Sequence, residues 1–188
     1  MDIFIGISGL LAYIIGALPT GYIIAKLKGI NDIRAHGSGN IGATNVSRFL
    51  GKHYFFLIFF LDAGKAYIYM HLIKEYVDFN QLCILASILL FGNGCSLFLQ
   101  GSGGKGVATL CGLLASLYPA TLLPLFLGWL FILFITHTVG IASVVAVMLL
   151  PVYAYTTDNN AFFLFALFAT IWIIHTHRSN IKLYWQKH

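Results

Sequence analysis

Two short polar stretches carry the residues that could do chemistry in this sequence. The first is GSGNIGATNVSR, residues 37–48, and the second is GSGGKGVAT, residues 101–109. Both combine several glycines with hydroxyl, amide or cationic side chains. Glycine accepts the positive φ angles that turn consecutive backbone N–H groups toward one point, so both stretches predict nests for an anion.

The first stretch offers more than backbone donors. Arg48 can hold two phosphate oxygens at once through its planar guanidinium, and neutral hydrogen-bonding groups come from Ser38, Asn40, Thr44 and Asn45. The stretch also opens onto an apolar helix, whose first N–H groups favour a phosphate. A flexible loop with one arginine that only sets topology is the alternative interpretation.

The second stretch surrounds Lys105 with glycines on both sides. It is not a Walker A loop, because that motif places Ser or Thr directly after Gly-Lys to hold magnesium, and here Gly106 follows. We therefore expect a nest for a monophosphate or an acyl phosphate, with Lys105 as a mobile charge, and no nucleoside triphosphate site. An ordinary helix-capping turn is the alternative.

A third polar stretch, HTHRSNIK at residues 175–182, supplies His177, Arg178 and Asn180 after the last apolar segment. His175 and His177 are two residues apart, so they do not share a helix face and do not form a pair of metal ligands. The cysteines fall in or beside apolar segments and are interpreted as small buried hydrophobes: Cys83, Cys95 and Cys111. The sequence therefore predicts no metal site.

Asp62 and Lys65 form an ionisable pair inside an apolar segment. Their i,i+3 spacing puts them on one helix face. Ionisable residues within a membrane are costly and are kept for function or structure, so we expect a structural pair that braces the site. A proton or ion path is the alternative.

The composition shows what must position these residues. The chain of 188 residues is 59% hydrophobic and only 9% charged, with a mean hydropathy of +0.86, which indicates an all-α integral membrane protein. We expect about seven transmembrane helices, the first of them not cleaved as a signal peptide. Val107–Tyr118 is short and prolines follow it, so five helices plus re-entrant segments are the alternative. The apolar runs are 3–25, 54–73, 80–99, 107–118, 120–136, 139–155 and 161–176.

Charge predicts the orientation of these spans. Nine of the eleven Lys and Arg residues fall on one side: Lys26, Lys28, Arg34, Arg48, Lys52, Lys105, Arg178, Lys182 and Lys187. Acidic residues fall at the other ends: Asp2, Glu75, Asp78 and Asp158. The positive-inside rule then places the N-terminus outside and the C-terminus in the cytoplasm. All three polar stretches meet the cytoplasmic face, and the net charge of +5 reflects this bias, with no indication of nucleic-acid binding.

The segments GSGNIGATNVSR, GGKGVAT and HRSNI, in this order, resemble the acyl-phosphate:glycerol-3-phosphate acyltransferases, the bacterial PlsY family. The longer run LKGINDIRAHGSGNIGATNVSRFLGK and the motif LDAGKA extend the likeness over essentially the whole chain. The resemblance implies a single transmembrane acyltransferase domain, residues 1–188. It also implies a multi-pass protein of the bacterial cytoplasmic (inner) membrane whose active site faces the cytoplasm and uses no cofactor.

The resemblance implies catalytic roles for Ser38, Arg48, His177 and Asn180. It implies that glycerol 3-phosphate binds at a loop made of Gly103, Gly104, Lys105 and Gly106. By residue type, further substrate-binding candidates are Gly37, Asn40, Thr44, Asn45 and Ser143. The chain departs from the usual family pattern at four positions, which are Asn93, Ser96, Gly140 and Ser179.

In this reaction the 1-hydroxyl of sn-glycerol 3-phosphate attacks the carbonyl of an acyl phosphate and gives lysophosphatidic acid and phosphate, the first step of bacterial phospholipid synthesis. The His-x4-Asp pair of other glycerolipid acyltransferases is missing from the sequence, which argues against acyl-CoA chemistry of that type. An acyl phosphate already carries a good leaving group, so the protein must chiefly position two anions and neutralise charge. His177 is the candidate general base or hydrogen-bond donor, and the acyl chain is expected to lie between the spans, in contact with membrane lipid.

Two other functions are alternatives. A transporter or channel for a small organic anion would use the same nests, but alternating access would also require suitable polar residues on the outer face. That face offers only acidic residues and the TTDNN loop. A catalytically silent relative is the second alternative, suggested by Asn93 and Ser179.

Overall fold

The computed structural model describes residues 2–186. Lys187, counted above on the cytoplasmic side, lies outside the described residues. Regular structure within them is helical throughout, which confirms the all-α prediction. The α-helices are α1 (Asp2–Ala17), α2 (Thr20–Leu27), α3 (Ala43–Leu50), α4 (His53–Ile73), α5 (Phe79–Gly94), α6 (Val107–Leu117), α7 (Leu122–Thr136), α8 (Val139–Val147), α9 (Leu149–Tyr155), α10 (Asn160–Thr176) and α11 (Arg178–Trp185). The 3-10 helices are η1 (Ile33–Ala35), η2 (Leu97–Leu99) and η3 (Pro119–Thr121).

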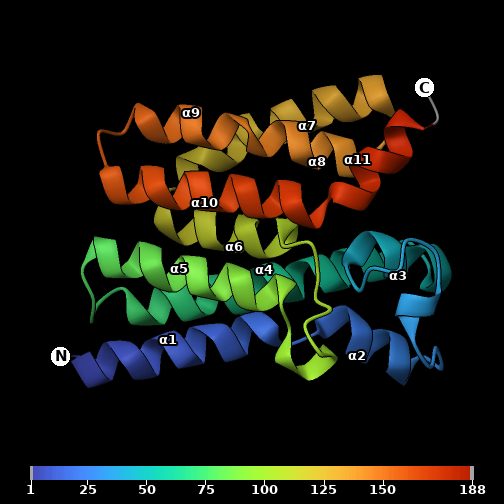
Figure 1. Ribbon diagram of the computed structural model, residues 1–188, viewed down its shortest axis with the longest axis horizontal. Helices are drawn as coiled ribbons and strands as arrows, with labels where there is room; N and C mark the ends of the chain where they lie inside the picture. The colour runs from blue at the N-terminus through green and yellow to red at the C-terminus, as the bar shows by residue number, and fades with distance from the viewer. Residues whose placement is uncertain (1, 187–188) are drawn as a thin grey trace.

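The seven apolar runs of the sequence form helices that lie side by side, and the two termini lie at opposite ends of the bundle (Figure 1). Within the described residues, four helical stretches are long and apolar enough to cross a membrane: Ile3–Leu27, His53–Ile73, Phe79–Leu99 and Pro119–Thr136. A fifth is added if α10 and α11, bent by 55°, count as one span, and α6 and Val139–Tyr155 are shorter apolar helices. A multi-pass helical membrane protein is confirmed, and the count of seven crossings stays a prediction.

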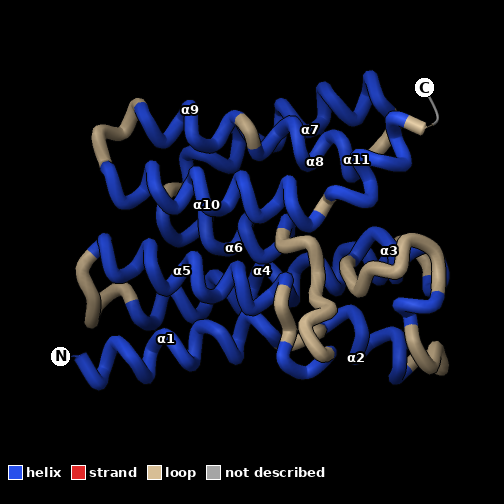
Figure 2. Tube along the Cα trace, viewed as in Figure 1, coloured by secondary structure: helices blue, strands red, loops and turns tan. Residues whose placement is uncertain are grey.

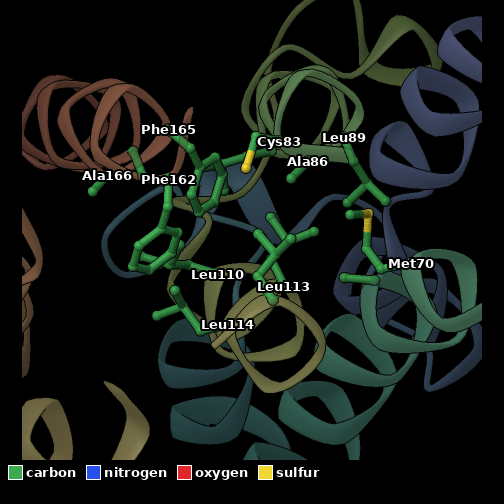
Figure 3. Close-up of a cluster of buried hydrophobic side chains, with 14 of the residues drawn as sticks. Met70, Cys83, Ala86, Leu89, Leu110, Leu113, Leu114, Phe162, Phe165 and Ala166 are labelled. Atoms are coloured by element: carbon green, nitrogen blue, oxygen red, sulfur yellow. The ribbon is translucent and has the colours of Figure 1, made fainter. Parts of the chain in front are cut away.

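The core lies where α4, α5, α6 and α10 meet. Figure 3 shows Phe162 and Phe165 of α10 packed against Leu110, Leu113 and Leu114 of α6, with α5 closing the other side. The outer surface is apolar as well, and α7 has no buried residue. Such a surface suits contact with lipid, where apolar side chains need no cover from other helices.

Small residues let the helices approach closely. A Cβ on Gly112 of α6 would lie 2.7 Å from the carbonyl carbon of Ala63 in α4. A Cβ on Gly92 of α5 would lie 2.5 Å from the carbonyl oxygen of Tyr13 in α1. These glycines occupy the contacts between helices, as small residues commonly do in membrane bundles.

The first apolar run is broken between α1 and α2, and side chains from other helices satisfy the freed carbonyls. Lys65 Nζ of α4 donates to Gly16 O (3.1 Å) and Leu18 O (2.8 Å), and Ser96 Oγ donates to Ala17 O (2.6 Å). Asp62 lies 2.7 Å from Lys65 Nζ and accepts from Thr20 Oγ1 at the start of α2. The pair therefore holds the break, because unsatisfied carbonyls inside a membrane are costly.

Long loops gather at one end of the bundle, the end that carries α2, α3 and the C-terminus (Figure 2). The α2–α3 loop, the η2–α6 loop and the bend between α10 and α11 all lie there (Figure 1). The helices of the core therefore deliver the three polar stretches of the sequence to the same end.

Candidate functional site

The loop before α3 is built around the amide of Asn45. Asn45 is 2% exposed; its Oδ1 accepts from Ser38 N (2.9 Å), and its Nδ2 donates to His36 O (3.0 Å) and Asn40 O (2.9 Å). Gly37 and Gly39 have φ of 59° and 70°, which glycine adopts without strain. Asn45 thus shapes the loop from within, while the hydroxyl of Ser38 stays exposed.

Arg48 stands on α3 beside this loop. Its side chain is exposed, and in the part of the chain that is described it forms no hydrogen bond or ion pair. Thr44 lies one turn earlier on the same helix, half-buried. A free guanidinium and a hydroxyl therefore stand on the face of α3 next to the glycine-rich loop.

The second glycine loop is fastened to the end of α5. Gly103 N donates to Gly94 O (3.0 Å) and Gly104 N donates to Asn93 O (2.8 Å). A Cβ on Gly103 would lie 2.6 Å from the carbonyl carbon of Gly94, so only glycine fits there. Gly106, with φ of 86°, turns the chain into α6.

Lys105 links the second loop to the third stretch. Its ammonium donates a hydrogen bond to Asn180 Oδ1 on α11, and its backbone oxygen accepts from Thr176 Oγ1 (3.0 Å). Asn40 Nδ2 of the first loop approaches Gly103 O of the second at 3.5 Å. The three stretches predicted to share one face therefore come together.

His177 lies at the bend between α10 and α11 and is 3% exposed. Its Nδ1 lies 2.8 Å from Ile173 O, and since a carbonyl only accepts, Nδ1 carries the hydrogen. In the neutral ring Nε2 then carries a lone pair. His175 contacts Arg178 instead, with 2.9 Å between its Nε2 and the guanidinium. The two histidines therefore have different partners, and only His177 is buried at the bend.

The site carries two cationic side chains, Lys105 and Arg48, and no described carboxylate forms an ion pair with either of them. Burial, and then the charge of Arg48, lower the pKa of Lys105 to about 8. The acidic side chains with ion pairs in the described residues belong elsewhere: Asp32 pairs with Arg34, and Asp62 pairs with Lys65. Hydrogen bonds from Arg34 lower the pKa of Asp32 to about 2. Lys105 and Arg48 therefore remain available to an anion.

The candidate Ser143 and the family departure Gly140 both lie on α8, in different surroundings. Ser143 is buried, where its hydroxyl donates to Val139 O (2.9 Å) and accepts from Trp129 Nε1 (3.2 Å) of α7. Gly140, one turn earlier, is buried directly against Asn180. The hydroxyl of Ser143 is thus used between α7 and α8, and Gly140 is the α8 residue that meets the site.

Thr176 is a site residue that the sequence did not single out. Its hydroxyl bonds both Lys105 O and Ile173 O, each at 3.0 Å. Threonine at a helix end commonly bonds its own helix, so the residue type gave no sign of the second bond. Its position directly before His177 was the available signal.

The fold and this cluster define an all-helical membrane protein with a cationic site at one end. The sequence profile of the glycerol-3-phosphate acyltransferase family matches residues 6–187. The chain belongs to this family and is a membrane acyltransferase.

Individual relatives show the extent of the match. The glycerol-3-phosphate acyltransferase of Thermosipho melanesiensis is 38% identical over 96% of this chain and 86% of its own length. That of Aquifex aeolicus is 38% identical over 91% of this chain and 90% of its own length. The crystal structure of PlsY (YgiH), an integral membrane glycerol 3-phosphate acyltransferase, superposes in its glycerol 3-phosphate form with a TM-score of 0.89. It is 34% identical and covers 95% of this chain and 90% of that one. The lysophosphatidic acid form has a TM-score of 0.87 at 33% identity, with the same coverage.

Proposed function

We propose that the protein transfers a fatty acyl group from an acyl phosphate to the 1-hydroxyl of sn-glycerol 3-phosphate, giving lysophosphatidic acid and inorganic phosphate. The observation that carries this proposal is the environment of Lys105. Its ammonium is held by a neutral amide, Arg48 stands near it, and within residues 2–186 neither cation pairs with a carboxylate. Two phosphate-bearing substrates supply the negative charge that such a site lacks.

The roles follow from the chemistry that each group can perform. Lys105 and the N–H groups of its loop hold the phosphate of glycerol 3-phosphate, with Asn180 positioning the ammonium. Arg48 and Ser38 hold the phosphate of the donor. Asn45 keeps the first loop in shape, and Asn40 joins it to the second.

The reaction requires one bond to form and one to break. The hydroxyl oxygen forms a bond to the carbonyl carbon, and the bond from that carbon to the phosphate oxygen breaks, with the electron pair leaving on phosphate. The hydroxyl proton passes to His177 Nε2, which bears a lone pair when Nδ1 is bonded to Ile173 O. The departing phosphate then takes the proton, so that neither the histidine nor the solvent accumulates charge.

We also propose a single transmembrane domain over residues 1–188 that crosses the bacterial inner membrane seven times, with the N-terminus outside and the site in the cytoplasm. Termini at opposite ends of the bundle are consistent with an odd number of crossings (Figure 1). The basic loops at the end that carries the site support the cytoplasmic assignment. The acyl chain lies between helices, against lipid.

The test is acyl transfer by the purified protein in lipid bilayers, supplied with acyl phosphate and labelled glycerol 3-phosphate. We expect labelled lysophosphatidic acid with acyl phosphate and none with acyl-CoA. Uptake of label without product would indicate a transporter, and neither uptake nor product would indicate a silent relative. Either result would overturn the proposal.

The variant Arg48→Ala tests the role of Arg48 in the same acyl-transfer assay. Removing a positioned donor to a developing charge costs about 100-fold or more, so turnover should fall by at least that factor while the protein still inserts and folds. Lys52→Ala is the matched control, because Lys52 is an exposed cation at the start of α4. Near-normal turnover by Arg48→Ala would contradict the assignment.

A further inference from the structure

Lys105 is held at both of its ends by the bend between α10 and α11. Asn180 Oδ1, on α11, accepts the hydrogen bond of the Lys105 ammonium. Thr176 Oγ1, on the last residue of α10, donates to the backbone oxygen of Lys105 at 3.0 Å. The bond from Thr176 joins residues 71 positions apart in the sequence, so it ties the second glycine loop to the bend.

The hydroxyl of Thr176 also reaches the carbonyl oxygen that holds His177. Thr176 Oγ1 lies 3.0 Å from Ile173 O, and the same oxygen accepts from His177 Nδ1 (2.8 Å) and His177 N (3.1 Å). A threonine hydroxyl has one proton to donate, so Thr176 shares it between Lys105 O and Ile173 O. One hydroxyl therefore connects the main chain of Lys105 to the carbonyl that orients the ring of His177.

A second threonine of α10 forms a comparable bond away from the site. Thr170 Oγ1 donates to Val147 O of α8 at 3.1 Å, in a buried part of the bundle. Both threonines thus donate from α10 to a backbone oxygen of another segment. Thr176 fastens the loop that carries Lys105, whereas Thr170 fastens two helices to each other, so the pair can distinguish a role in the site from a role in folding.

We propose that Thr176 is a positioning residue for the acyl-transfer reaction: its hydroxyl holds the Lys105 main chain against the bend between α10 and α11. It thereby sets where the Lys105 ammonium meets the phosphate of glycerol 3-phosphate, relative to the histidine that receives the hydroxyl proton. Thr176 acts through Lys105 and does not itself bind a reactant. The inference rests on the proposed function for its substrate, and the tie itself can be tested without any substrate.

The first test measures the tie in the protein without substrate. Amide hydrogen exchange of peptides that cover the glycine loop, residues 101–106, is followed by mass spectrometry in lipid bilayers. Thr176→Val keeps the shape of the side chain but lacks the hydroxyl, so exchange in this loop should become about threefold faster or more. Thr176→Ser, which keeps the hydroxyl, and Thr170→Val should both leave exchange in the loop unchanged.

The second test measures steady-state kinetics. Thr176→Val should raise KM for glycerol 3-phosphate about fivefold, the effect of one lost hydrogen bond, and leave KM for the acyl phosphate unchanged. The fall in kcat should be smaller than the rise in KM, because His177 keeps its bond to Ile173 O. Thr176→Ser should restore KM, and Thr170→Val should not alter it, even where the two valine variants have the same Tm. If Thr176→Val folds poorly, Thr176→Ala removes the hydroxyl with less bulk and should raise KM in the same way.

The outcomes separate the two proposals. If the unmodified protein forms lysophosphatidic acid, an unchanged KM in Thr176→Val, or the same change in Thr170→Val, would overturn the positioning role and leave the acyl-transfer proposal standing. Unchanged exchange in the glycine loop of Thr176→Val would overturn the tie as well. Faster exchange in Thr176→Val alone, in a protein that makes no lysophosphatidic acid, would support the tie and overturn the proposed function.

Discussion

At the scale of single residues, the site depends on cations that have no carboxylate partner in the part of the chain that the structure describes. Lys105 is half-buried in a loop of glycines, and its pKa is lowered by burial and then by the charge of Arg48. The positive charges of Lys105 and Arg48 repel each other when no anion is bound. The unfavourable energy is relieved when an anion binds, so the same arrangement that lowers the pKa of Lys105 favours a phosphate.

The lowered pKa predicts how substrate affinity depends on pH. The pKa of Lys105 is about 8 in the free protein, so the ammonium is present below pH 8 and is lost above it. The second pKa of a phosphate monoester is near 6, so the substrate stays a dianion between pH 7 and 9. Affinity for glycerol 3-phosphate should therefore fall as pH rises, by about tenfold between pH 7 and pH 9.

Isothermal titration of glycerol 3-phosphate into the protein at several pH values checks this. Lys105→Arg keeps its charge throughout this range, so any binding that it retains should be independent of pH. An equally steep fall in Lys105→Arg would show that another group titrates.

At the scale of elements, the apolar runs predicted the helices well, and their breaks poorly. The runs 54–73, 107–118 and 161–176 became α4, α6 and α10 with ends shifted by one residue. The run 3–25 became two helices, because its break depends on partners far along the chain, Lys65 and Ser96. Periodicity within one segment carries no information about such partners.

Another unpredicted break, between α8 and α9, shows the same principle. Pro151 has no N–H, which leaves the carbonyl of Val147 without its helical partner. Thr170 Oγ1 of α10 donates to that carbonyl at 3.1 Å. The proline was visible in the sequence, but the hydroxyl that makes the break tolerable was not.

The α1–α2 break gives a prediction about stability. Lys65→Met removes the donor to two carbonyls and leaves Asp62 as an uncompensated charge at a little-exposed position. Breaking a buried pair from one side costs about 3–5 kcal/mol, so Tm in detergent should fall clearly. The double variant Lys65→Met with Asp62→Asn should recover part of the loss, because no charge is left unpaired.

A matched control uses the other ion pair. Arg34→Met breaks the pair with Asp32, whose side chains are more than one third exposed, and should lower Tm much less. If Lys65→Met and Arg34→Met lowered Tm by the same amount, Asp62 and Lys65 would not brace the break.

At the scale of the whole molecule, the sequence predicted which stretches meet but not how they touch. Charge bias and the parity of spans placed the three polar stretches at one end, and the structure brings them together there. The contacts of Asn45 within its loop, and of Gly140 with Asn180, depend on loop shape and helix tilt. Residue types and spacing specify neither the shape of a loop nor the tilt of a helix. Asn45 and Ser143 were chosen as substrate-binding candidates by residue type alone, which carries no information about these contacts.

The sidedness of the whole chain gives the last prediction. In a background with the three native cysteines replaced, single cysteines are placed at exposed positions and treated with an impermeant maleimide in vesicles of known orientation. The substitutions are Ser38→Cys, Ser102→Cys, Ala120→Cys and Thr156→Cys. Ser38→Cys and Ser102→Cys should react only from the cytoplasmic side, since α4 and α5 return the chain to the side it left.

Two positions decide the number of spans. Thr156→Cys, in the turn after α9, should react only from outside. Ala120→Cys follows α6, a helix of 11 residues that is about 16 Å long at 1.5 Å per residue, against a hydrocarbon core of about 30 Å. If α6 crosses with the help of the glycine loop before it and η3 after it, Ala120→Cys reacts from outside and the seven-span topology stands. Reaction of Ala120→Cys from the cytoplasm would make α6 re-entrant, and reaction of Ser38→Cys and Ser102→Cys from opposite sides would leave no common site for two anionic substrates.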